Sequence, residues 1–465
     1  MRPPHRLGAA EIAAAYDSGA LTPTRLVGHL LERIAALDPR LNAFIRVEGE
    51  AALAAAAVAE GELRAGRRRG PLHGIPVGIK DIIDVAGLPT TCHSRLRLGD
   101  VAAADAAVVE RLRAAGAIPF GKLSTHEFAI GGPAFDLPFP PARNPWNTAH
   151  HPGGSSSGSG AGLAAGLFPL ALGTDTGGSV RNPASQCGVV GLKPTYGLVS
   201  RRGVFPLAWT LDHVGPMARD VAGVALLLAA IAGHDPLDPG SVAPPAAVPA
   251  ALPAGGVRGL RVGFVRHFHE TDLPADAEVA AALEAVAGWL RQAGASVRDV
   301  SLPPLGEFAA VNRVLLHAEA FALHAPWLRG RPGDYARITR TALLTGAFLT
   351  AEDYVRAQRA RGRMIAAVEA AFGEADLLLT ASSMHASAPI DDAAEVARTY
   401  PRQARTPFNV TGHPAVAMMA GLSAGGLPLS VQFVAPYFAE ARLLGVAAAY
   451  ERAAAWGGCP MLEAG

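Results

Sequence analysis

Short apolar runs that alternate with helical patterns constrain the fold of this 465-residue chain most strongly. The runs at residues 75–79, 117–120 and 169–173 are bounded by Gly or Pro, which is typical of buried strands. Helical patterns, such as residues 103–115, lie between them. Strands and helices in this order form a sheet with helices on both faces. The sequence therefore predicts an α/β fold whose central sheet is mixed and largely parallel.

The two ends of the chain extend this prediction. Residues 1–69 are expected to form a helical layer, because Thr22-Pro23 forms a helix start that is followed by apolar residues on one helical face. A stretch rich in Pro and Ala, residues 236–257, is expected to be a long surface loop. We expect one domain over residues 1–465. Beyond the loop, strands are predicted at 260–265, 376–380, 415–419 and 429–433, and helices at 276–293, 351–372 and 439–452.

Charge and cysteine content exclude several classes of protein. The 41 basic residues are balanced by 40 acidic ones, so no basic field attracts nucleic acid or an anionic membrane. The three cysteines stand far apart, which fits neither a disulfide framework nor a zinc site and indicates a reducing compartment. The apolar runs are shorter than a membrane span, and the first residues lack the apolar core of a signal peptide. We expect a cytoplasmic protein.

Lysine is rare in this chain. Among the 41 basic residues only Lys80, Lys122 and Lys193 are lysines. Arginine keeps its proton in proteins, whereas a buried lysine can lose it. Each lysine is therefore a candidate for chemistry, although codon bias explains their scarcity equally well.

The densest local signal is the Gly- and Ser-rich stretch at residues 151–160, which allows several interpretations. It could be a flexible linker, but an apolar helical pattern follows it directly. Residues 160–165 match the dinucleotide pattern G-x-G-x-x-A, yet no strand precedes them. Residues 154–158 match G-x-S-x-G with Ser156 at the centre, yet Pro152 and two glycines make a poor strand end.

A second stretch, residues 173–181, has a stronger physical argument. Gly177 and Gly178 precede Ser179, so successive backbone N–H groups can turn toward one point, as an oxyanion hole requires. The alternative is a simple turn in which Ser179 caps a helix. A serine nucleophile needs a proton acceptor, and both Lys80 and Lys122 follow apolar runs that would favour the neutral amine. Spacing alone does not choose between the two lysines.

Taken in order, these motifs resemble the amidase signature family. The similarity rests on residues 74–81, 153–159, 173–185 and 188–197, and a weaker match continues at residues 408–415. The resemblance implies an amidase-signature fold with a signature core at residues 70–220. It also implies that residues 258–465 form a divergent half that determines the substrate.

The resemblance further implies a catalytic triad. Ser179 is the expected nucleophile, Ser155 the bridging serine after a cis Gly154–Ser155 bond, and Lys80 the base. The oxyanion hole maps onto the N–H groups of Thr176, Gly177, Gly178 and Ser179. Ser156, Asp175 and Arg181 are expected to support the site without reacting. The family mechanism forms an acyl-enzyme and uses no metal or cofactor.

Three functions are compatible with these residues. The first is an independent hydrolase of small or aryl amides, with carbamates and ureas as related substrates. The second is the glutaminase (A) subunit of a tRNA-dependent amidotransferase, ranked lower because no clamp for a glutamine carboxylate is evident in the divergent half. The third is an inactive scaffold or binding subunit, against which the intact triad argues. The expected partner is a small-molecule amide. No nucleic acid is expected to bind directly and no membrane is expected, and the chain could assemble as a homodimer.

Overall fold

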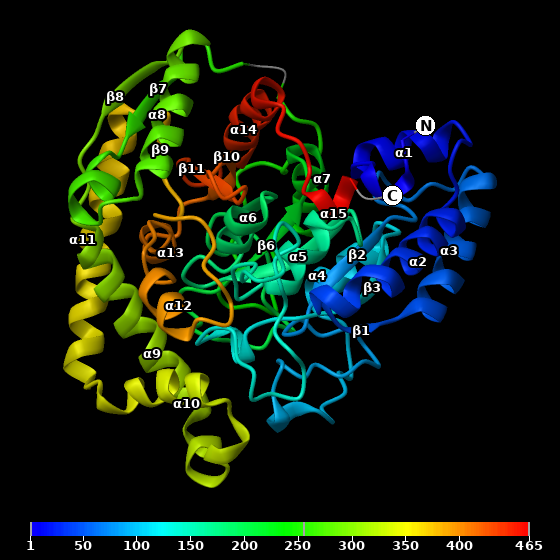
Figure 1. Ribbon diagram of the computed structural model, residues 1–465, viewed down its shortest axis with the longest axis horizontal. Helices are drawn as coiled ribbons and strands as arrows, with labels where there is room; N and C mark the ends of the chain where they lie inside the picture. The colour runs from blue at the N-terminus through cyan, green and yellow to red at the C-terminus, as the bar shows by residue number, and fades with distance from the viewer. Residues whose placement is uncertain (1, 254–255, 464–465) are drawn as a thin grey trace.

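A single 11-stranded sheet runs through the molecule. The computed structural model describes residues 2–253 and 256–463. In Figure 1 the sheet extends through the molecule from the N-terminal helices to the edge formed by β7 and β8. The strand order is β1-β3-β2-β4-β6-β5-β10-β11-β9-β7-β8. The strands are β1 Phe44–Val47, β2 Pro76–Lys80, β3 Ile118–Leu123, β4 Leu170–Asp175, β5 Val190–Lys193, β6 His213–Ala218, β7 Arg261–Phe264, β8 Ser296–Asp299, β9 Leu377–Ala381, β10 Ala415–Leu422 and β11 Pro428–Val434.

The sheet is mixed, as predicted, but its centre is antiparallel. Parallel pairing joins β2 to β3 and β4 at one end, and β7 to β8 and β9 at the other. The remaining neighbours are antiparallel, so parallel pairs are fewer than the sequence suggested. One cause is the tight turn between β10 and β11, where Gly426 has a φ of 74°, because so short a connection can join only antiparallel strands.

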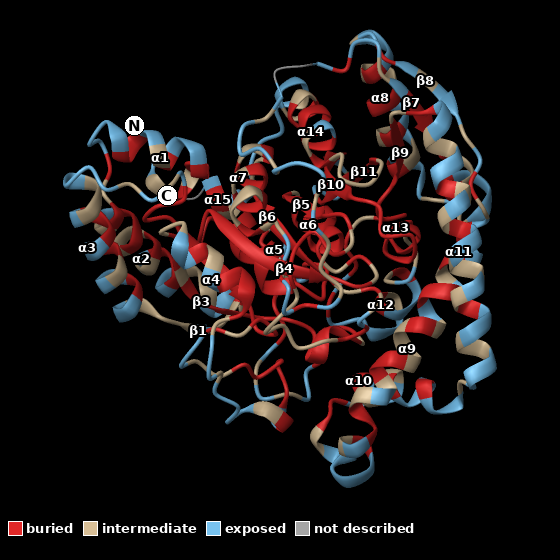
Figure 2. Cartoon of the chain, turned by 180° about the vertical axis from the view of Figure 1, so that it is seen from behind, coloured by how far each residue is buried: buried red, intermediate tan, exposed pale blue. Residues whose placement is uncertain are grey.

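Helices cover the sheet and leave its centre inaccessible. In Figure 2 the central strands and the short helices α5 and α6 are buried, whereas the outer helices expose one side. The long helices α9 and α11 lie side by side on one flank (Figure 1). The helices are α1 Ala9–Asp17, α2 Pro23–Leu41, α3 Gly49–Arg64, α4 Ala107–Ala114, α5 Ser157–Ala164, α6 Arg181–Cys187, α7 Val221–Ile231, α8 Ala277–Gln292, α9 Leu305–Gly330, α10 Arg337–Leu344, α11 Ala351–Glu374, α12 Ala393–Thr399, α13 Thr406–Val410, α14 Glu440–Ala454 and α15 Pro460–Glu463.

Most strands and helices named from the sequence appear within a few residues of their predicted bounds. The N-terminal layer differs, because it contains strand β1 as well as helices. Phe44 fixes this strand on the sheet edge, where its ring meets the rings of Phe120 and Phe168 edge-on. Within 236–257, the described residues form a connection without helix or strand, and residues 254–255 of that prediction lie outside the description. None of the helices in the described ranges is long and apolar enough to span a membrane.

Candidate active site

Ser179 lies in a turn between β4 and α6, at residues 176–180, which we call the Ser179 turn. The Asp175 carboxylate shapes this turn by accepting the N–H groups of Gly178 (2.8 Å) and Val180 (3.1 Å). Gly178 has a φ of 125°, a conformation that side chains disfavour. The serine is partly exposed, although nearly all its neighbours are buried. The turn therefore presents Ser179 at the end of a rigid strand.

Free N–H groups surround Ser179. Within the described chain, no hydrogen bond engages the N–H groups of Thr176, Gly177 or Ser179. The structure differs from the sequence expectation at Gly178, whose N–H already donates to Asp175. The turn can thus offer up to three N–H groups to an oxygen atom bound beside Ser179.

Lys80 lies at the end of β2, at the bottom of the site. Its Nζ donates to Ser155 Oγ and to Thr174 Oγ1, both at 2.7 Å. The side chain has no exposed surface, and this burial lowers the pKa of Lys80 to about 7. Near neutral pH, a substantial fraction of Lys80 is therefore an uncharged amine that can accept a proton.

Ser155 connects Lys80 to the Ser179 turn. The Gly154–Ser155 peptide bond is cis, as the resemblance implied. The N–H of Ser156 donates to the carbonyl of Ser179 (3.2 Å), which ties the two segments together. Ser156 Oγ also accepts the N–H of Thr174 and donates to its carbonyl, both at 3.2 Å. The structure contains no hydrogen bond between the Ser155 and Ser179 hydroxyls.

The other two lysines have different surroundings. Lys122 Nζ is 3.1 Å from Asp81 Oδ1 and donates to Thr90 Oγ1 (2.9 Å), so it forms a buried ion pair. Lys193 Nζ donates to the Pro194 carbonyl (2.9 Å) and does not contact either serine. Of the two lysines that spacing left open, Lys80 is the one that hydrogen-bonds to Ser155.

Asp175 and Arg181 form a fully buried ion pair below the turn. Arg181 Nη2 is 2.9 Å from Asp175 Oδ1, and its Nε donates to Asp175 Oδ2 (3.0 Å). Burial alone would raise the pKa of Asp175, but the Arg181 guanidinium holds it well below its usual range. Asn409 Nδ2 donates to Asp175 Oδ1 (2.7 Å), and Arg181 Nη1 donates to Gln432 Oε1 (2.7 Å). This network fixes the Ser179 turn against the C-terminal strands.

A cavity of about 270 Å³ opens over Ser179, and we call it the Ser179 cavity. Gly154 and the Ser179 turn line it, together with Asn312 and Arg313 of α9. Asn312 Nδ2 donates to the Thr176 carbonyl (3.1 Å), which fastens α9 to the turn. Arg405, from the loop before α13, completes the lining near Gly178.

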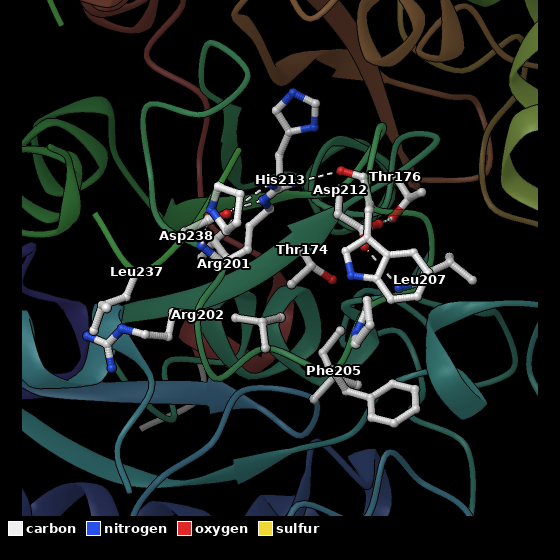
Figure 3. Close-up of a pocket in the computed structure, with 16 residues that line it drawn as sticks. Thr174, Thr176, Arg201, Arg202, Phe205, Leu207, Asp212, His213, Leu237 and Asp238 are labelled. Atoms are coloured by element: carbon white, nitrogen blue, oxygen red, sulfur yellow. Dashed lines mark hydrogen bonds and ion pairs between the residues drawn. The ribbon is translucent and has the colours of Figure 1, made fainter. Parts of the chain in front are cut away.

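A second cavity of about 210 Å³ is adjacent, and Thr176 and Leu207 line both cavities. Figure 3 shows Thr174, Thr176 and Asp212 on its wall. Thr176 Oγ1 donates to Asp212 Oδ1 (2.6 Å), and burial raises the pKa of Asp212 to about 6. Thr174, which lines this cavity, also accepts the hydrogen bond from Lys80 Nζ.

Sequence reasoning missed the residues that the second half of the chain contributes. Asn312 and Arg313 belong to α9, a helix that was not predicted, and Arg405 follows no recognisable motif. Among the described residues, no group of three or more His, Cys, Asp or Glu side chains is arranged to hold a metal ion.

Comparisons with known proteins agree with this architecture. The family model described as Amidase matches residues 25–444. A Glutamyl-tRNA(Gln) amidotransferase subunit of Chloroflexus aggregans is 38% identical, and the match covers 97% of both chains. The solved peptide amidase of Stenotrophomonas maltophilia superposes with a TM-score of 0.87 at 34% identity, covering 98% of both chains. A vestigial protein complex, described as revealing the origins of an s-triazine catabolic enzyme, has a TM-score of 0.90 at 33% identity and covers 97% of this chain and 100% of its own.

These comparisons correct one expectation. The prediction that the partners include no nucleic acid is wrong, because full-length relatives are subunits of an amidotransferase named for a tRNA. The argument from net charge failed because it averages over a whole chain, whereas contacts with RNA depend on local surface or on other subunits of an assembly.

Proposed function

Because this chain belongs to the amidase signature family of hydrolases, we propose that it cleaves an amide C–N bond through Lys80, Ser155 and Ser179. One observation carries the proposal: the fully buried Lys80 Nζ donates to Ser155 Oγ at 2.7 Å, beneath the Ser179 turn. A lysine in this setting loses its proton near neutral pH. It can then act as a general base.

The proposed reaction begins with a proton relay. Neutral Lys80 takes the hydroxyl proton of Ser155, and Ser155 takes the proton of Ser179 as Ser179 Oγ attacks the amide carbon. The tetrahedral intermediate collapses when the relay returns a proton to the leaving nitrogen, so that the C–N bond breaks. Water then attacks the acyl-enzyme by the same route and regenerates Ser179. This relay requires a hydrogen bond between the two serine hydroxyls in the substrate complex. Catalytic hydrogen bonds are often longer without substrate and shorten when it binds.

Backbone N–H groups would stabilise the intermediate. Thr176, Gly177 and Ser179 provide donors without competing acceptors, and each such donor contributes about 3 to 4 kcal/mol in known enzymes. The N–H of Gly178 holds Asp175 instead, and its missing side chain leaves space beside Arg405. Ser156, Asp175 and Arg181 would keep the turn and the relay in register without contacting substrate.

The sequence relatives favour the glutaminase subunit of a tRNA-dependent amidotransferase, which the sequence analysis had ranked second. Relatives named for this amidotransferase are 38% and 36% identical over 97% of the chain. In this reading the chain hydrolyses glutamine, releases ammonia and works within an assembly that handles tRNA. The activity would then depend on partner subunits.

An independent amide hydrolase remains the second candidate. The specific observation for it is the likeness to a peptide amidase, at a TM-score of 0.87. The third reading, an inactive scaffold, is disfavoured because Lys80 donates to Ser155 Oγ and the N–H of Ser156 donates to the Ser179 carbonyl, so the lysine and both serines are present and close together.

Two measurements test the proposal on the purified chain. A fluorophosphonate probe should label the protein at Ser179, and Ser179→Ala should abolish this labelling. Release of ammonia, or of aniline from the anilide, should be followed with glutamine, benzamide, an anilide and an aryl carbamate, and Lys80→Ala should reduce any turnover by orders of magnitude. Unchanged labelling of Ser179→Ala, or unchanged turnover by Lys80→Ala, would refute the assignment of the relay.

A further inference from the structure

Arg405 is a buried cation whose environment supplies no anion. Its side chain is 3% exposed, and Nη1 donates to the Ser382 carbonyl (2.9 Å) and to Ser383 Oγ (2.7 Å). Nε has no acceptor among the described residues. These neutral contacts hold the guanidinium in place but do not balance its charge.

The carboxylate whose charge acts on Arg405 cannot fill this role. Asp175 is already bound through both oxygens by Arg181, and Asn409 occupies one of them as well. Burial, together with the repulsion from Arg181, lowers the pKa of Arg405 to about 9. A buried charge without a partner is unfavourable, so we expect the Arg405 guanidinium to bind an anion when the protein is active.

Arg405 lies directly beside the reacting atoms. A Cβ placed on Gly178 would be 2.5 Å from Arg405 Nε, and Gly178 is the residue before Ser179. The guanidinium therefore faces the Ser179 cavity at the level of the turn.

The charges around the Ser179 cavity are of one sign. The exposed Arg313 stands on the α9 side, and the remaining titratable groups of the lining are His126, His317 and Tyr400. The described residues of the lining include no aspartate or glutamate. An anionic group on a ligand would therefore be attracted into this cavity, where Arg405 is the cation beside Gly178.

We propose that Arg405 binds a carboxylate of the substrate, so that the amide cleaved at Ser179 carries a carboxylate at the other end of a short acyl chain. This inference rests on the proposed function and specifies its substrate class. Glutamine and the monoamides of short dicarboxylic acids share this chemistry. Arginine suits it because its planar fork pairs with a carboxylate through two hydrogen bonds.

The first test compares two amides that differ only in charge. Glutaric acid monoamide carries the carboxylate, and 5-methylhexanamide replaces it with an isopropyl group. We expect kcat/KM to favour the charged amide, mainly through KM, and Arg405→Gln to reduce this preference about 10- to 100-fold. Arg405→Lys should restore part of it. Arg361→Gln is the matched control, because Arg361 also donates to two carbonyls but lies outside the Ser179 cavity lining.

Comparison of glutamine with glutaric acid monoamide separates the two substrate sources. Faster turnover of glutamine would assign the carboxylate to an amino acid amide, and faster turnover of the monoamide would assign it to a dicarboxylic acid. Equal turnover of 5-methylhexanamide and glutaric acid monoamide by the wild-type protein would overturn the inference. So would a preference that Arg405→Gln leaves intact.

A binding measurement keeps this inference separate from the relay. Glutarate should bind the Ser179→Ala protein in calorimetry, and the added Arg405→Gln or Arg405→Lys change should weaken binding, more for Gln than for Lys. No turnover is needed, so the result stands even if Ser179 is not the nucleophile. Glutarate binding that is absent, or equal in all three proteins, would overturn the role of Arg405, whereas fluorophosphonate labelling reports on the relay alone.

Discussion

Removal of one contact to Lys80 should shift the pH dependence of catalysis by a calculable amount. Lys80 Nζ donates to Thr174 Oγ1 at 2.7 Å, and Thr174→Val removes this acceptor with little change in volume. A hydrogen bond to a charged group contributes about 1.5–3 kcal/mol, and a neutral one about 0.5–1.5 kcal/mol. The ammonium therefore loses about 1 kcal/mol more than the neutral amine. Because 1.36 kcal/mol equals one pKa unit, the pKa of Lys80 should fall by about 0.7.

The assay is kcat/KM against pH between about 5 and 9. Neutral Lys80 is the active form, so the wild-type rate should rise with pH through a midpoint near the Lys80 pKa of about 7 and then level off. In Thr174→Val the midpoint should move to lower pH, whatever happens to the plateau. Thr90→Val is the matched control, since Thr90 Oγ1 accepts a similar bond from Lys122 at 2.9 Å. A midpoint that is unchanged or raised in Thr174→Val would refute the reasoning, as would an equal shift in Thr90→Val.

Three further outcomes are expected. Ser179→Ala should lose turnover and fluorophosphonate labelling, with an unchanged unfolding midpoint in urea. Asp175→Asn should lower the free energy of unfolding by about 3–5 kcal/mol, because Arg181 loses its buried partner. The exposed pair of Asp391 with Arg143 provides the control, and Asp391→Asn should cost less than about 1 kcal/mol in the same urea titration. Gly178→Ala should lower both the Tm and kcat/KM, since its φ is 125° and the added methyl meets Arg405. A Gly178→Ala protein with wild-type Tm would contradict the described turn.

Local sequence was sufficient to predict most of the sheet. Residues 75–79, an apolar run after Gly74, form strand β2, and residues 429–433, in which apolar and polar residues alternate after Pro428, form strand β11. The parallel or antiparallel direction of each strand pair was harder to predict, because it depends on which strands become neighbours in the sheet. Sequence order does not contain that information directly.

Helix α9 was not predicted from the sequence, for a different reason. Its buried side includes polar residues such as Asn312, Glu319 and His324, and Pro326 lies within it. Each of these features weakens the apolar pattern by which a helix is recognised. The polar positions are buried because they hydrogen-bond to other parts of the structure, as Asn312 does with Thr176. Only the folded chain shows those partners.

The candidate site also combines residues that local sequence predicts with residues that only the folded structure shows. The residues proposed for the relay lie in Gly- and Ser-rich strings whose backbone requirements are visible in the sequence, and their catalytic roles stay a prediction. Arg405 could not be predicted in this way. It stands out because its buried Nε has no acceptor among the described residues. Such an absence is a property of tertiary packing.

The ion pair beneath the Ser179 turn also determines when the protein can become active during synthesis. Asp175 and Arg181 leave the ribosome more than 200 residues before Asn409 and Gln432, which complete their hydrogen bonds at 2.7 Å. A nascent chain that ends near residue 300 thus carries the motif around Ser179 without the groups that fix its shape. Contacts so distant in sequence form late in folding. We therefore expect C-terminally truncated chains to remain inactive even when every residue of the Ser179 turn is present.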